Sequence, residues 1–174
     1  MKINDYKKIE IMIIEYYLNL KMISAKTERV QKLKEILKNI DNWHLDTDIQ
    51  AVNNDKICVS GGALPYSSMD KQIDNIFTNI EIIEKEKEHI YTEIIKNEHL
   101  IRELEKKNIK TNELLSMLDK ESQELLYLKY GEEYSYDEIA EKILTCKSNV
   151  HIKIKNIMRD LHKLIVYMNS IKNS

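Results

Sequence analysis

The side chains best suited to chemistry lie near the C-terminal end of the chain, after a short turn at residues 144–146. The amide of Asn149 can form two hydrogen bonds with adenine, a lysine can reach guanine, and an exposed Ile152 can touch a thymine methyl group. Cations further along this segment suit phosphate oxygens. The candidate DNA-contacting residues are Lys147, Ser148, Asn149, His151, Ile152, Lys153, Lys155, Arg159 and Lys163.

Charge is distributed unevenly along the chain. From Lys142 onward, six lysines and one arginine stand against a single acid, Asp160, so this segment carries +6 and residues 1–141 carry −8 of the net charge of −2. A basic segment on an acidic body can direct one face toward phosphate. The charge pattern therefore agrees with the side-chain types in indicating a nucleic-acid interface.

The spacing of the residues gives little support for catalysis or for metal binding. The five histidines have no ligand spacing among themselves, and Cys58 and Cys146 form neither a disulfide framework nor a CxxC motif. Nucleophile motifs such as GxSxG are absent from the sequence, and the many glutamates of residues 81–105 alternate with cations as on a solvated helix face. We therefore expect no catalytic residue, no metal site and no cofactor, and a protein that is not an enzyme.

The elements that position the candidate residues are predicted to be helices. The chain of 174 residues has three Gly and one Pro, with 43% hydrophobic and 32% charged residues, which favours amphipathic helices and argues against an all-β fold. Asp119 is a candidate N-cap, Ser135 and Glu138 form a capping box, and Gly131 is expected to end a helix as a C′ glycine. A final helix is predicted to begin near Lys147.

The pattern of these short helices predicts a helix-turn-helix. A small residue, Ala140, stands where two helices must cross closely, and a tight turn follows. The second helix of such a unit enters the major groove with its N-terminal residues. Its inner stripe is predicted to contain Val150, Ile154, Ile157, Leu161, Leu164 and Met168.

Two long helical segments are predicted in the rest of the chain, over about residues 4–40 and over some forty residues from Met69. Polar Lys87 and Asn97 interrupt the apolar seam of the second segment and are expected to set register or oligomer number. The pattern leaves open whether these helices pair within a chain, as a coiled-coil-like hairpin, or between chains, as a dimer rod. An irregular linker is expected at about 41–68, with a short strand over 52–59 as one option, and the domains as 1–110 and 111–174.

Residues 114–165 resemble region four of bacterial sigma factors, the module that binds the −35 promoter element. The resemblance rests on LLSML, on ELLYLKYGEEYSYDEIAEKI, on the turn, and on a basic helix ending in DLHKLI. Leu144 stands where the family often has Gly in the turn, and Cys146 stands where it usually has a Ser or Thr cap. The resemblance implies binding to double-stranded promoter DNA and contact with RNA polymerase.

The whole chain is similar to phage regulators of the ArpU and RinA kind, which have an N-terminal helix, a Gly/Ser-containing middle, a long helix and a terminal sigma-like helix-turn-helix. This similarity implies control of late phage genes, such as those for packaging or lysis. The leading hypothesis is a homodimeric DNA-binding regulator in the cytoplasm of a bacterial host cell, without a membrane segment. The alternatives are a phage terminase small subunit that binds DNA for packaging, and a coiled-coil protein-interaction module with a solvated basic tail.

Overall fold

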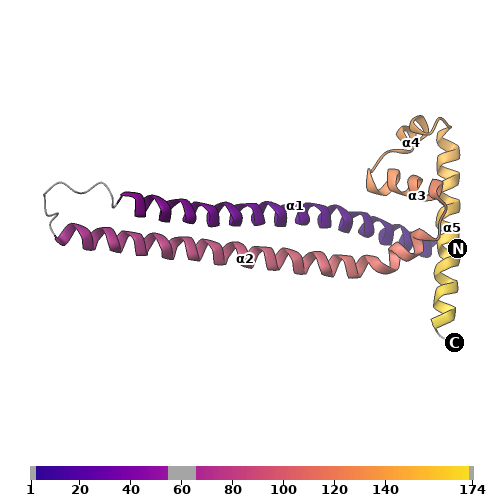
Figure 1. Ribbon diagram of the computed structural model, residues 1–174. Helices are drawn as coiled ribbons and strands as arrows, with labels where there is room; N and C mark the ends of the chain where they lie inside the picture. The colour runs from indigo at the N-terminus through magenta and orange to yellow at the C-terminus, as the bar shows by residue number, and fades with distance from the viewer. Residues whose placement is uncertain (1–2, 55–65, 173–174) are drawn as a thin grey trace. The chain divides into compact units, whose positions relative to one another are not determined.

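The computed structural model describes residues 3–54 and 66–172, and every regular element within them is helical. The predicted all-α class with a C-terminal helix-turn-helix is confirmed. The elements, drawn in Figure 1, are α1 (Ile3–Asn54), α2 (Tyr66–Ser116), α3 (Lys120–Leu126), the π-helical turn η1 (Tyr127–Gly131), α4 (Tyr136–Lys142) and α5 (Lys147–Lys172).

The helix α1 is longer than the sequence predicts. It continues through residues 41–54, which we assigned to an irregular linker, and α2 already begins at Tyr66. The extension contains several Asn and Asp but no Gly or Pro, and adding a residue to an existing helix requires no new nucleation. The linker and strand assignments are therefore wrong for the helical part, and their remaining residues, 55–65, lie outside the described ranges.

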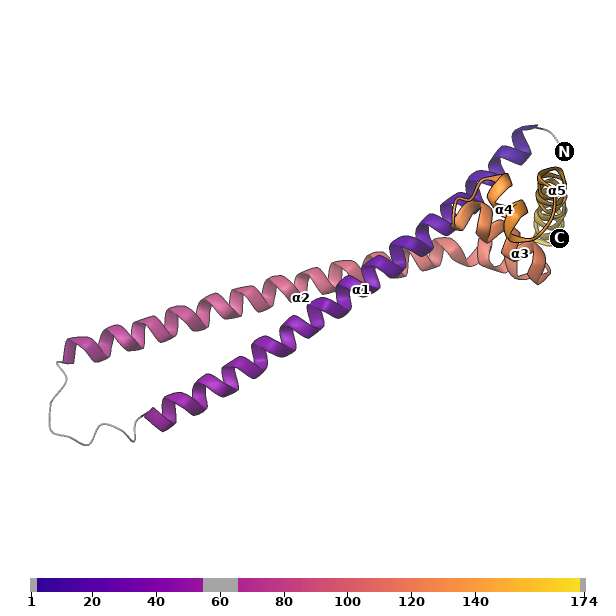
Figure 2. The ribbon, with the colours of Figure 1, turned by 90° about the horizontal axis from the view of Figure 1, so that it is seen from above.

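The chain divides into two compact units, and the first is a hairpin formed by Ala25–Leu100, here called the hairpin unit. Its α1 and α2 segments run in opposite directions (Figures 1 and 2). Among the residues of this unit whose side chains the structure describes, five apolar side chains are buried and three ion pairs connect the two helices. The buried residues are Val30, Leu33, Leu37, Ile90 and Ile94; the ion pairs are Arg29–Glu93 at 3.1 Å, Lys34–Glu98 at 2.8 Å and Lys87–Asp41 at 2.5 Å. The long helices thus pair within one chain.

The second unit, here called the head, comprises Met1–Ser24 together with Ile101–Ser174. One hydrophobic cluster joins the start of α1 to the helix-turn-helix: Ile9, Ile13 and Tyr17 are buried together with α3, α4 and α5. Figure 2 shows α3 and α4 against α5. The full cluster contains Ile9, Ile13, Tyr17, Leu114, Leu115, Leu125, Leu126, Leu128, Tyr130, Ile139, Ala140, Val150, Ile154, Ile157, Met158 and Leu161. Folding of residues 111–174 by themselves, as the predicted domain boundary implies, stays a prediction.

A pair of amides links α1 to α2 inside the head. The Asn19 Nδ2 donates to the Asn108 Oδ1 at 2.8 Å, and the Asn108 Nδ2 donates to the Tyr16 carbonyl oxygen at 3.3 Å. Asn108 is only 7% exposed, so an unmatched amide there would be costly and the pair favours one register of the two helices. Of the seam residues predicted for this purpose, Lys87 does reach the other helix, whereas Asn97 donates to the Glu93 carbonyl oxygen of its own helix.

Gly131 does not have the predicted C′ conformation, because its φ is not positive. It ends the π-helical turn η1, and a Cβ at this position would lie 2.6 Å from the Tyr127 Cδ2 and 3.3 Å from the Tyr17 Cδ1. The glycine therefore provides room for two tyrosine rings. The left-handed conformation falls two residues later, at Glu133, with a φ of 62°.

The turn between α4 and α5 also contains a residue with positive φ. Leu144 has a φ of 52° and is 94% exposed. Its side chain is therefore too exposed for packing to offset the unfavourable backbone conformation. For a residue with a Cβ, this region of backbone space costs roughly 1–2 kcal/mol. The turn thus requires the geometry that Gly supplies in related turns, although Leu occupies the position.

We expect Leu144→Gly to raise the free energy of unfolding by about 0.5–1 kcal/mol, because relief of the backbone strain exceeds the added entropy of the unfolded chain. Urea unfolding of the full chain measures the change. Leu144→Ala is the matched control: it removes the same exposed side chain but keeps the strain, so its stability should remain near that of the wild type. Equal stability of the Gly and Ala variants would contradict the strain argument.

We expect Asn108→Leu to lower the free energy of unfolding by about 1–2 kcal/mol, because it leaves the half-buried Asn19 amide without its acceptor. The double variant Asn19→Leu/Asn108→Leu should recover most of that loss, since both polar partners are then removed. Asn97→Leu serves as control and should change stability little, because that amide bonds only to its own helix. Equal losses in the single and double variants would show that the amide pair is not the cause.

Candidate nucleic-acid interface

The helix α5 separates an apolar face from a polar one. Val150, Ile154, Met158 and Leu161 are completely buried, each at 0% exposure, in the core of the head. All nine candidate DNA-contacting side chains are exposed, including Ile152 at 54%. Packing against α3 and α4 thus holds the helix by its apolar side and leaves the candidate surface open to a ligand.

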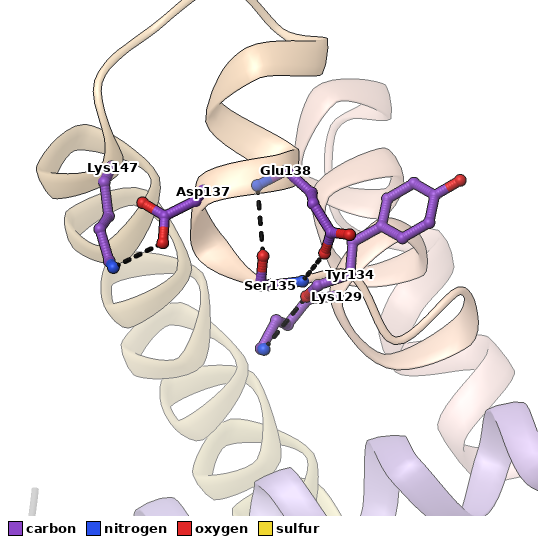
Figure 3. Close-up of polar contacts among 6 residues, drawn as sticks. All are labelled: Lys129, Tyr134, Ser135, Asp137, Glu138 and Lys147. Carbon is purple, nitrogen blue, oxygen red and sulfur yellow. Dashed lines mark hydrogen bonds and ion pairs between the residues drawn. The ribbon is translucent and has the colours of Figure 1, made fainter.

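The two short helices that support α5 begin with the predicted caps. The Asp119 carboxylate accepts the backbone N–H of Ser122 at 2.9 Å, and this bond lowers the pKa of Asp119. At the start of α4, the Ser135 hydroxyl accepts the backbone N–H of Glu138 at 3.3 Å, while the Glu138 carboxylate accepts the Ser135 N–H at 2.7 Å (Figure 3). The capping box is therefore confirmed, and its bond from Ser135 lowers the pKa of Glu138.

The first turn of α5 begins after a cysteine in place of the usual hydroxyl cap. The backbone N–H of Asn149 donates to the Cys146 carbonyl oxygen at 3.0 Å, and the Cys146 Sγ lies 3.2 Å from the Ser148 Oγ. The Ser148 hydroxyl, and after it the Asn149 backbone N–H, lower the pKa of the thiol. The Asn149 side chain donates to the Thr145 Oγ1 at 3.3 Å, so the turn orients the amide that could read adenine.

Three candidate side chains lie at the flanks of the exposed face, next to the supporting helices. The Lys147 Nζ is 2.7 Å from the Asp137 Oδ2 of α4 (Figure 3), and the His151 ring is 5.4 Å from the Tyr136 ring in an edge-on arrangement. On the other side, Lys153 forms an ion pair with Glu121 of α3. Both flanking lysines are thus held by a carboxylate from a neighbouring helix.

The centre of the exposed face follows helical spacing along α5. Ser148, Ile152, Arg159 and Lys163 fall at intervals of four, seven and four residues, which places them on one stripe. Asn156 lies in the same stripe and is exposed, although our sequence analysis omitted it. Its spacing of four residues from Ile152 would have been sufficient to predict this position from the sequence. Lys163 pairs with Asp160 of its own helix at 2.8 Å, whereas Lys155 and Arg159 pair with no acid among the described residues.

Two lysine–tyrosine contacts fix the loop that precedes α4. The Lys129 Nζ donates to the Tyr134 carbonyl oxygen at 3.2 Å (Figure 3). The same Nζ lies 4.5 Å from the Tyr136 ring centre. The Lys142 Nζ lies 4.7 Å from the Tyr134 ring centre. Such cation–π contacts contribute about 0.5–1 kcal/mol at exposed sites. Sequence reasoning did not find them, because they join residues that a turn brings together.

Within residues 3–54 and 66–172, no three His, Cys, Asp or Glu side chains gather as a metal site would require. None of the helices described is long and apolar enough to cross a membrane.

Comparison with known proteins identifies the same part of the chain. Residues 110–161 match the family model described as Sigma-70, region 4, which spans the last turns of α2, all of α3 and α4, and the first part of α5. No curated protein and no solved structure matches the chain. The head thus contains a sigma-70 region-4-like helix-turn-helix, a DNA-binding module.

Proposed function

We propose that this protein is a transcriptional regulator that binds promoter DNA in a sequence-specific manner, with α5 as the recognition helix. The observation that carries the proposal is the division of α5 into a sealed apolar face and an exposed face of cations, amides and hydroxyls. Recognition helices of this class enter the major groove by their N-terminal residues. The match to sigma-70 region 4 supports the same function.

In this proposal the exposed face has two tasks. Lys155, Arg159 and Lys163 attract the phosphate backbone, which contributes affinity without sequence information. Lys147, Ser148, Asn149, His151, Ile152 and Lys153, in the first two turns of α5, read base edges in the groove. Asn156 joins this second group on the strength of its position between Ile152 and Arg159.

The finer proposal is a regulator of late genes of a phage or prophage, acting as a homodimer in the cytoplasm of a bacterial host cell and contacting RNA polymerase. It rests on the resemblance to phage regulators and on the sigma-like module. The hairpin unit offers two long helices through which two copies could associate. A terminase small subunit remains the rival function, and a test can separate the two.

Selection of bound fragments from a phage-containing bacterial genome should enrich sites upstream of promoters. Light scattering of the purified protein should give the mass of a dimer. Enrichment of a single packaging site together with a ring of eight or more subunits would instead identify a terminase. Failure of the full chain to retain any fragment at low salt would contradict DNA binding altogether.

We expect Arg159→Ala to weaken binding to all duplexes about equally and to reduce the slope of log affinity against log salt by about 1, because one phosphate contact is lost. Asn149→Ala should instead relax the preference at one base pair, by about 1–3 kcal/mol, with the salt slope unchanged. Electrophoretic mobility shifts over a series of salt concentrations measure both. Lys32→Ala in the hairpin unit is the charge-matched control and should leave binding intact.

A further inference from the structure

Two carboxylates on other helices form ion pairs with Lys147 and Lys153 of α5, one at each flank of its exposed face. Asp137, in the first turn of α4, pairs with Lys147 at 2.7 Å, and Glu121, in the first turn of α3, pairs with Lys153. All four side chains remain between 46% and 68% exposed, so the pairs lie at the surface where DNA would approach. Because exposed ion pairs contribute little to folding, stability alone does not explain both of them.

The cations of α5 therefore differ in their availability to phosphate. Lys155 and Arg159 have no acidic partner among the residues that the structure describes, so their charge is free to attract the DNA backbone. Lys147 and Lys153 must exchange a carboxylate for a phosphate before they can do the same. The exchange would also leave a negative carboxylate beside a negative phosphate.

We propose that Glu121 and Asp137 are specificity-determining residues, which act as positioning residues for Lys153 and Lys147 and weaken the binding of DNA of unrelated sequence. The inference rests on the proposed function, DNA binding by α5. It names the intramolecular partners of two lysines that the proposed function assigns to base contacts.

The distinction between phosphate and base follows from the hydrogen-bonding capacity of lysine. Its ammonium group has three N–H donors, so it can keep one bond to a carboxylate and direct another to the acceptors of guanine. A base contact therefore leaves the ion pair intact, whereas a phosphate contact competes with it. Non-specific binding consists almost entirely of phosphate contacts, so the two acids lower its affinity more than that of specific binding.

The test compares substitutions that remove one negative charge each. Glu121→Gln and Asp137→Asn remove the paired acids, and Glu124→Gln on α3 and Glu141→Gln on α4 are the controls. Both control acids are exposed and pair with no cation in the described parts of the chain, yet they change the net charge equally. The probes are a 30-base-pair duplex of random sequence and the tightest duplex that the wild-type full chain selects from a random pool.

We expect Glu121→Gln and Asp137→Asn each to tighten binding to the random duplex roughly threefold to tenfold at low salt, since a freed lysine gains a phosphate contact. The selected duplex should gain less, so the ratio of the two affinities falls. The controls should change both affinities by the same small factor. Circular dichroism and thermal unfolding establish that each variant is folded, and because the two acids lie on separate helices, either variant can carry the test.

A double-mutant cycle shows whether each acid acts through its lysine. In a Lys153→Ala background, Glu121→Gln should no longer tighten non-specific binding beyond the effect of Glu124→Gln. If the wild type binds the selected duplex but the paired-acid variants behave like the controls, this inference is wrong. The proposed function would not be affected by that result. Absence of any DNA binding by the wild type would overturn the proposed function and this inference with it.

Discussion

The head depends on the burial of one apolar face of α5 by helices that are distant in the sequence. Ile154, Met158 and Leu161 are sealed by α3, by α4 and by the first turns of α1, where Ile13 is itself completely buried. Since burial of a large aliphatic side chain is worth about 1.5–3 kcal/mol, this face accounts for much of the stability of the head. The same packing decides which side of α5 remains exposed.

Helices α1 and α2 each contribute residues to both compact units. The start of α1 completes the core of the head, and its continuation pairs with α2 in the hairpin unit. The Asn19–Asn108 amide pair favours one register of these helices inside the head.

Ion pairs distinguish the flanks of the exposed face of α5 from its centre. Carboxylates from α3 and α4 hold Lys153 and Lys147 at the flanks, while Arg159 lies in the central stripe. A surface made only of free cations would bind any phosphate backbone, and its affinity would depend mainly on salt. Under the proposed function, the acids beside Lys147 and Lys153 weaken general attraction to phosphate more than they weaken contacts with bases.

The sequence alone determined the features that arise from neighbours a few residues apart: the caps at Asp119 and Ser135, the start of α5 at Lys147 and most of the apolar stripe of α5. The prediction of that stripe omitted Met158, which is completely buried. The sequence was misleading at Gly131, because glycine occurs both where φ is positive and where a Cβ would clash with a neighbour. Here it makes room for tyrosine rings and does not have a positive φ. Only the tertiary structure decided that Ile9, Ile13 and Tyr17 belong to the head and that Glu121 meets Lys153. The physical reason is separation along the chain: helical periodicity reports which side chains share a face, whereas the partner of that face is chosen by packing among distant helices.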